Sequence, residues 1–133
     1  MSYSIDVLEE EQCVVVVHTG ETPISDFIKA RNKAAKRLKE KGWSKIIFDS
    51  RAVEHTPTLI EAYGLTAGFT SVFSSETHIA VLINPDRDLD VNFLEDSAKQ
   101  TYGLSFKIFN EYKAALQWLV RSEEVRPRAR FDF

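Results

Sequence analysis

The sequence contains one cysteine, five glycines and no long apolar run. Cys13 has no second cysteine with which to form an intrachain disulfide bond, and it lies in the apolar run 13–17, where a thiol behaves as a small buried hydrophobic group. No segment approaches the roughly 18 apolar residues of a transmembrane helix, and the first residues lack the basic and apolar regions of a signal peptide. These features predict a cytoplasmic protein without a membrane span.

Motifs for metal binding and for several catalytic mechanisms are also missing. His18, His55 and His78 are isolated, without the His-x-x-x-His or His-x-x-Glu spacing that brings two ligands together, so no metal and no cofactor is predicted. The sequence lacks Gly-x-Ser-x-Gly, and its glycines form neither Gly-x-Gly-x-x-Gly nor a Gly-Lys-Ser/Thr phosphate loop. We therefore expect a protein that is not an enzyme.

The charge of the chain is nearly balanced, with 17 Lys and Arg, 20 Asp and Glu, and a net charge of -3. Binding to DNA or RNA depends on a positive electrostatic field, so a nucleic acid is not a predicted partner. Basic residues do gather in residues 29–41. We interpret this segment as the solvated outer face of a helix, and contact with an acidic partner or an anionic lipid head group is the alternative.

Strand-type and helix-type apolar patterns alternate along the chain. Strands are expected at residues 3–8, 13–18, 45–48, 78–83 and 106–109, and helices at residues 23–42, 58–73, 90–102 and 112–120. Parallel strands need a crossover connection, so the alternation predicts an α/β fold with a single mixed, mostly parallel five-stranded sheet flanked by about four helices. We expect one domain over residues 1–120 and a charged C-terminal tail with little helix over residues 121–133.

Capping signals define several of these helices. Thr58 and Glu61 have the spacing of a capping box at the start of the second helix, although Thr56-Pro57 offers a competing start. The third helix begins at about Asp88 or Asp90. In the last helix, Leu116 and Leu119 are expected to be buried against the last strand.

The order of elements, together with Asp49 after the strand Ile46-Ile47-Phe48 and the closing segment Ala115-Leu116-Gln117-Trp118-Leu119, resembles the SpoIIAA-like family. These are small bacterial α/β proteins related to STAS domains and to CRAL-TRIO lipid-binding domains, and the resemblance covers about residues 3–120. The resemblance implies the fold of this group more firmly than a role. In phospho-regulated STAS proteins a kinase modifies the Ser of an Asp-Ser-x-Gly motif at the second helix, but residues 55–59 here lack that Asp, Ser and Gly.

Ligands of open α/β sheets bind beyond the carboxyl ends of parallel strands. We apply that rule and add the residues at the start of the second helix. The candidate binding residues are then Asp49, Ser50, Arg51, His55, Thr56, Thr58, Tyr63, Asn84 and Asp86, and the rule also selects His18 and Thr19. Asp49 and Arg51 could hold a polar ligand between a carboxylate and a guanidinium. In the simpler alternative, Asp49 accepts hydrogen bonds from loop amides and Arg51 points to water.

The second helix carries more apolar side chains than one buried stripe requires: Tyr63, Leu65, Phe69, Val72 and Phe73. Our leading hypothesis is a non-enzymatic, STAS-like regulatory module in which this helix recognises a protein partner or a second copy of the chain. The alternative is a protein that binds a small apolar or lipid-like ligand between the second helix, the third helix and the sheet. A closed core beneath the second helix would favour the first hypothesis, and an apolar cavity with polar groups at its mouth would favour the second.

Overall fold

The computed structural model describes residues 2–54, 58–86 and 90–131, which form a five-stranded sheet with the strand order β1-β2-β3-β4-β5. The strands are β1 (Tyr3–Leu8), β2 (Cys13–Gly20), β3 (Lys45–Val53), β4 (His78–Leu82) and β5 (Ser105–Phe109). β1 pairs with β2 in the antiparallel sense, and β2 to β5 are parallel. The predicted α/β fold with a mixed, mostly parallel sheet is confirmed.

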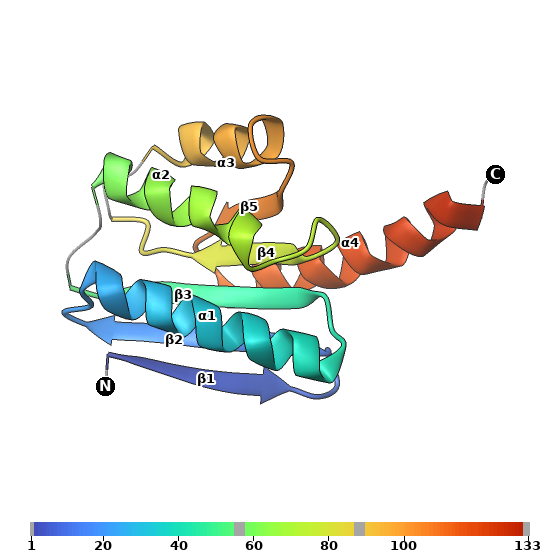
Figure 1. Cartoon of the computed structure of the whole chain (residues 1–133), viewed down its shortest axis with the longest axis horizontal. Coiled ribbons are helices and arrows are strands. Elements are labelled where there is room, and N and C mark those ends of the chain that lie inside the picture. Colours follow the sequence, from blue (N-terminus) through green and yellow to red (C-terminus); the bar gives the residue numbers. More distant parts are fainter. Residues whose placement is uncertain (1, 55–57, 87–89, 132–133) are drawn as a thin grey trace.

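The helices cover both faces of this sheet. They are α1 (Ile24–Lys41), α2 (Leu59–Gly68), the short 3-10 helix η1 (Phe69–Ser71), α3 (Val91–Gln100) and α4 (Tyr112–Phe131). Adjacent parallel strands follow one another in the sequence, so crossovers of one hand place α1, α2 and α3 on the same face, while α4 packs on the other (Figure 1). None of the described helices combines the length and apolarity needed to cross a membrane.

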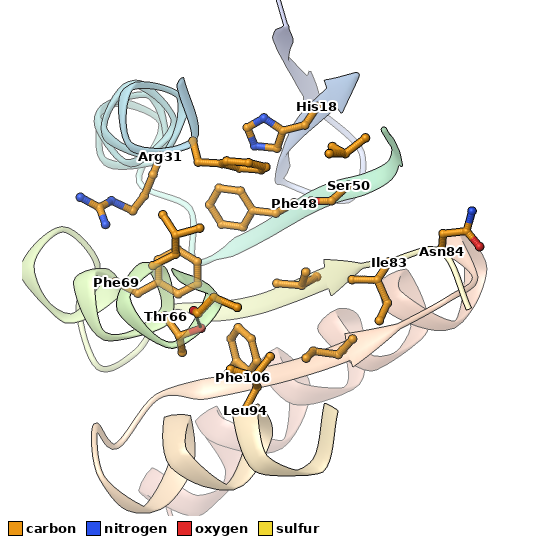
Figure 2. A pocket seen from close by; sticks show the side chains of 16 residues that line it. His18, Arg31, Phe48, Ser50, Thr66, Phe69, Ile83, Asn84, Leu94 and Phe106 are labelled. Carbon is orange, nitrogen blue, oxygen red and sulfur yellow. Dashed lines mark hydrogen bonds between the residues drawn. The ribbon is translucent and has the colours of Figure 1, made fainter. Parts of the chain in front are cut away.

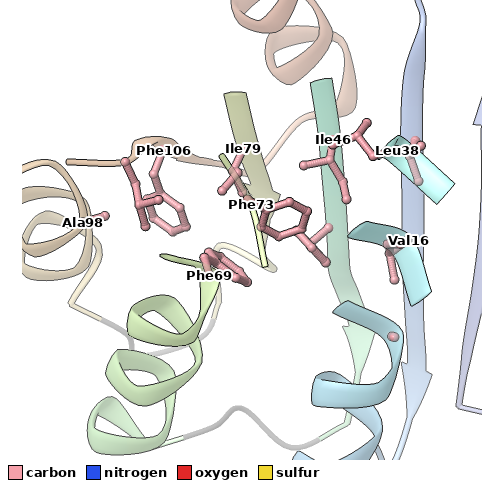
Figure 3. Packing of buried hydrophobic residues seen from close by; sticks show 13 residues of the cluster. Val16, Leu38, Ile46, Phe69, Phe73, Ile79, Ala98 and Phe106 are labelled. Carbon is pink, nitrogen blue, oxygen red and sulfur yellow. The ribbon is translucent and has the colours of Figure 1, made fainter. Parts of the chain in front are cut away.

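Each face of the sheet has its own hydrophobic core. Alternation along the strands directs Val16, Ile46 and Ile79 toward α1, α2 and α3, where Phe69, Phe73 and Phe106 fill the space between the layers (Figure 3). The intervening residues, Val15, Ile47 and Ala80, pack against Ala115 and Leu119 of α4. Leu119 is fully buried, as predicted, but its buried neighbours, such as Ile47 and Ala80, belong to β3 and β4 rather than to the last strand, and Leu116 is half-buried.

The starts of α2 and α3 have the capping residues that the sequence predicts. The capping box of α2 is confirmed, because the Glu61 amide donates to Thr58 Oγ1 at 3.2 Å and the Thr58 amide donates to Glu61 Oε1 at 2.9 Å. Asp90 caps α3 by accepting a hydrogen bond of 3.0 Å from the Phe93 amide. The competing starts at Thr56-Pro57 and Asp88 lie outside the described residues.

Two helix ends differ from the sequence prediction. The α-helical part of α2 ends at Gly68 rather than near Phe73, because two glycines weaken it and the hydroxyls of Thr70 and Ser71 bond to the carbonyl oxygens of Ala67 and Gly68. α4 continues through Phe131, so the prediction of little helix after residue 120 is wrong. Arg and Glu, which have high helix propensities, make up six of residues 121–131, and Pro127 is the one strong helix breaker among them.

Candidate functional site: a cavity between the sheet and three helices

The predicted site residues of the third strand lie on opposite faces of the sheet. β3 continues to Val53, so Asp49, Ser50 and Arg51 are still part of the strand rather than of a loop after it. Successive side chains of a strand point to opposite faces. Asp49 therefore lies on the face covered by α4, as Ile47 does, and Ser50 lies on the face of α1, α2 and α3, as Phe48 does.

Asp49 and Arg51 bind each other. Asp49 Oδ1 accepts hydrogen bonds from the Arg51 backbone amide at 3.1 Å and from Arg51 Nε at 2.9 Å, and Asp49 Oδ2 accepts one from Arg51 Nη2 at 2.8 Å. This bond to Asp49 raises the pKa of the Arg51 guanidinium. The carboxylate accepts from a main-chain amide, as the simpler sequence interpretation expects, although this amide belongs to β3 rather than to a loop. The Arg51 guanidinium pairs with Asp49 instead of pointing only to water.

A β-bulge follows this pair. Val17 of β2 is opposite Asp49, but Thr19 is opposite Ala52, so β3 contains one extra residue in this interval. Strict alternation would place Val53 on the same face as Asp49. The extra residue returns Val53 to the face of Phe48 and Ser50, where it is buried. The bulge therefore adds a third β3 side chain to one surface, next to His18.

That surface forms one wall of a cavity with a volume of about 120 Å³ between the sheet and α1, α2 and α3 (Figure 2). Most of its wall is apolar, and the larger apolar side chains that line it include Phe27, Phe48, Leu65, Phe69, Leu94 and Phe106. Phe48 and Phe69 stack with their ring centroids 5.3 Å apart. The polar side chains at its wall are His18, Arg31, Ser50, Thr66 and Asn84.

His18 is the most unusual of these polar residues. It is only 1% exposed, and its ring packs against Phe27 with the centroids 4.4 Å apart. Its Nδ1 atom has no hydrogen-bond partner among the residues that the structure describes. Burial lowers the pKa of His18 to about 4, although Asp26 and Asp49 act in the opposite direction. The imidazole is therefore neutral near pH 7.

Arg31 closes a different part of the wall, between α1 and α2. Its guanidinium lies against Gly68, where a Cβ atom would overlap Nη1, and its Nε donates to Asn32 Oδ1 at 3.3 Å. Burial lowers the pKa of Arg31, which nonetheless keeps its charge near pH 7. Figure 2 shows the guanidinium directed away from the His18 ring.

Hydrogen bonds within the protein involve two of the remaining polar groups. Thr66 Oγ1 donates to the Ala62 carbonyl oxygen at 2.9 Å, one turn earlier in α2. Asn84 Oδ1 accepts from the Asp86 backbone amide at 2.9 Å in the loop after β4. Both residues therefore have partners of their own, and the Nδ1 atom of His18 is the buried atom of the wall that lacks one among the described residues.

The structure brings only part of the predicted site together. Ser50 and Asn84 line the cavity, but Asp49 and Arg51 lie on the opposite face of the sheet. Thr58 caps α2, and Asp86 is exposed. The Tyr63 hydroxyl oxygen accepts a hydrogen bond of 2.8 Å from the Tyr102 hydroxyl, outside the cavity wall. The candidates His55 and Thr56 lie outside the described residues.

Sequence reasoning missed one cavity residue that a different pattern could have identified. The basic composition of residues 29–41 predicts a solvated position for Arg31, yet Arg31 follows Phe27 by four residues and precedes Leu38 by seven, so it falls on the apolar stripe of α1. The aromatic residues of the wall could not be distinguished from ordinary core residues, because both have the same periodicity. The excess of apolar residues in the second helix did include Leu65 and Phe69.

Comparisons with known proteins do not assign the chain to a family. No protein-family model matches the sequence, and no curated protein matches it significantly. The described residues contain no group of three or more His, Cys, Asp or Glu side chains that could hold a metal ion. The resemblance to SpoIIAA-like proteins stays a prediction based on the order of elements and on the motifs quoted above.

Proposed function

We propose that this protein binds a small, mainly apolar molecule in the cavity beneath α2. The observation that carries the proposal is the cavity itself, which has apolar walls and polar side chains from the strand ends. Of the two sequence-based hypotheses, this arrangement favours binding of a small apolar ligand over the closed core that a pure interaction module would have. Small-molecule sites are typically apolar concavities with a few polar groups that orient the ligand.

The apolar walls of the space support a role for it. The cavity is partly open to solvent, so a molecule that enters it would displace water from apolar side chains and bury apolar surface. A ligand that binds the folded state in this way would stabilise it.

We also propose that the protein binds its ligand without altering it. Cys13 lies on the face covered by α4, and burial raises the pKa of its thiol to about 12, so it is not a thiolate nucleophile at neutral pH. The neutral His18 has no serine or cysteine hydrogen-bonded to it among the described residues. These features support a binding role over a hydrolytic one.

Benzene is a suitable probe, because apolar cavities of roughly 150 Å³ bind it. We expect benzene to bind the wild-type protein, to shift the NMR signals of residues around the cavity and to raise the melting temperature. Ala62→Phe should abolish binding, since Ala62 lines the cavity. The matched control is Ala67→Phe, in the same helix but outside the lining, and it should still bind. Failure of the wild-type protein to bind benzene, or equal binding by Ala62→Phe, would contradict the proposal.

Partner recognition remains a second candidate, favoured by one surface of α2 and α3. Ile60 is 84% exposed and Phe93 is 44% exposed, and the Phe93 ring lies beside Tyr63 with the centroids 5.9 Å apart. Apolar side chains of this size at the surface are typical of interaction sites when they cluster. Sedimentation velocity over a range of concentrations tests self-association: Ile60→Asp should weaken any dimer, and a wild-type protein that stays monomeric excludes this form of the hypothesis.

A further inference from the structure

We infer that the cavity takes an amphipathic carboxylate, whose apolar body fills the cavity and whose carboxylate lies at the rim and pairs with the guanidinium of Arg31. This inference rests on the proposed binding function and adds to it the chemical class of the ligand. It starts from two observations. The wall is mostly apolar, and Arg31, the cation that lines it, has no carboxylate partner among the residues that the structure describes.

Arg31 differs from Arg51 in lacking a counter-ion. The guanidinium of Arg51 pairs with Asp49 at 2.8 Å. Within the described part of the chain, the guanidinium of Arg31 donates a long hydrogen bond of 3.3 Å from Nε to Asn32 Oδ1, and its Nη1 and Nη2 atoms have no acceptor. A carboxylate can accept two parallel N–H···O bonds from a guanidinium, which makes this pair both strong and specific in geometry.

The two Nη atoms are accessible to a ligand. They lack an acceptor among the described residues but are not buried, because His18 Nδ1 is the buried side-chain atom that lacks a partner in that part of the chain. Nη1 lies against Gly68, at the end of α2, and Figure 2 shows the head group directed away from the His18 ring. The guanidinium is therefore at the rim of the cavity, where a ligand group can reach it.

The charges around the cavity orient such a ligand. Asp26 of α1 and Asp49 of β3 act on the neutral imidazole of His18, so a further anion is disfavoured at that part of the wall. α1 as a whole is basic, with seven Lys and Arg residues and two acidic residues. Burial lowers the pKa of Arg31, and no described carboxylate offsets this effect. The carboxylate of the ligand is thus favoured at Arg31, with the apolar body toward His18.

The rim position also limits the cost of the ligand's charge. A carboxylate placed deep among apolar side chains would lose its hydration without gaining a cation. At the rim it keeps part of its hydration and neutralises a guanidinium that is itself partly removed from water. One guanidinium matches one negative charge, so it suits a carboxylate better than a phosphomonoester, which carries nearly two.

The apolar wall accounts for the rest of the ligand. Phe48, Phe69 and Phe106 line the space on the side of the sheet and of α2. Leu94 lines it from α3. A volume of about 120 Å³ is near that of cavities known to hold a single benzene ring. The apolar body of the ligand is therefore short, with roughly five or six carbon atoms.

The test compares hexanoate with its neutral analogue hexanamide by NMR titration at pH 7. We expect the wild-type protein to bind hexanoate more tightly than hexanamide. In Arg31→Met, which keeps an apolar stem and removes the charge, the hexanoate-to-hexanamide affinity ratio should fall by about fivefold. The matched control is Lys36→Met, which removes an exposed cation of α1 outside the lining and should keep the wild-type ratio.

A second measurement does not depend on the variants. In the wild-type protein, hexanoate should shift the ¹H and ¹⁵N signals of the Arg31 guanidinium, whereas hexanamide should shift signals of the wall, such as those of Phe69, and affect the guanidinium much less. Added salt should weaken the binding of hexanoate and not that of hexanamide, because charges at the rim are screened by ions.

The outcomes separate the two proposals. Tighter binding of hexanamide than of hexanoate, or the same affinity ratio in the wild-type protein and Arg31→Met, would overturn the role of Arg31 and leave the cavity as a binding site. An equal fall of the ratio in Lys36→Met would also overturn it, because the effect would then belong to the general charge of α1. If hexanoate, hexanamide and benzene all fail to bind the wild-type protein, the binding function itself is wrong.

Discussion

At the scale of single residues, the two histidines of the sheet show how the same side chain can have different surroundings. His78 is buried near Trp118, and its Nδ1 lies 2.7 Å from Ser105 Oγ. His18 is also buried and lines the cavity, but its Nδ1 has no partner among the described residues. The first is a satisfied core residue, and the second carries a buried, unsatisfied ring nitrogen. Their isolated positions in the sequence do not distinguish them.

The depressed pKa of His18 predicts a dependence of stability on pH. In the unfolded chain His18 takes up a proton near its ordinary pKa of 6.5, whereas in the folded protein it does so only near 4. The unfolded state therefore binds more protons between these values, and the free energy of unfolding should fall as the pH decreases from about 6.5 to about 4. We expect His18 to account for a loss of about 2 to 3 kcal/mol over this range, measured by urea unfolding.

Because carboxylates also titrate in acid, the control is His18→Leu measured in the same series. Between pH 7.5 and pH 4.5 the free energy of unfolding should fall less in the variant than in the wild-type protein. The difference between the two falls should be most of the roughly 2 to 3 kcal/mol that is predicted for His18. Parallel pH profiles for the two proteins would mean that His18 can be protonated in the folded state at little cost, contrary to its burial.

At the scale of elements, α2 is the helix of the cavity wall whose sequence has low intrinsic helix propensity. It contains Gly64 and Gly68, and its α-helical turns stop at Gly68 and continue as η1. A Cβ atom at Gly64 would meet open space, whereas one at Gly68 would overlap the guanidinium of Arg31. The two glycines therefore have different roles, since Gly68 leaves room for a cavity residue of α1.

These surroundings predict different effects of the same substitution. Gly64→Ala should stabilise the protein by about 0.5 to 1 kcal/mol, because alanine has the higher helix propensity and nothing obstructs its methyl group. Gly68→Ala should raise the free energy of unfolding by less, since the end of the Arg31 side chain must move to make room for the methyl group. Urea unfolding of both variants measures the difference, and an equal gain at both positions would show that Arg31 does not pack against α2.

At the scale of the whole molecule, α4 provides the cover for the second face of the sheet. Parallel sheets are normally buried on both faces, and here α1, α2 and α3 all lie on one of them. Cys13, Ile47 and Leu82 would face solvent without Ala115 and Leu119. The cavity face and the α4 face are thus separate cores that share one sheet.

Truncation of the α4 core should therefore lower global stability without affecting the cavity. Leu119→Ala should cost about 2 to 5 kcal/mol, because Leu119 is fully buried, and benzene binding by the folded protein should be unchanged. The control in the same helix is Val120→Ala, which should cost about 0.5 kcal/mol or less since Val120 is 37% exposed. Denaturant unfolding compares them, and a similar small cost for both would contradict the assigned face.

The sequence by itself determined the α/β class, the mixed sheet and most helix starts, because apolar periodicity and capping residues act over short distances along the chain. It also indicated that the second helix has an excess of apolar side chains, among them Leu65 and Phe69. The tertiary structure decided which residues share a site. One extra residue in β3 and the pleat of the strand place Ser50 and Val53 at the cavity and Asp49 with Arg51 on the opposite face. The packing of three helices brings His18 to the same cavity and leaves its Nδ1 buried without a partner among the described residues. Those relations join distant parts of the chain, so local sequence patterns do not encode them.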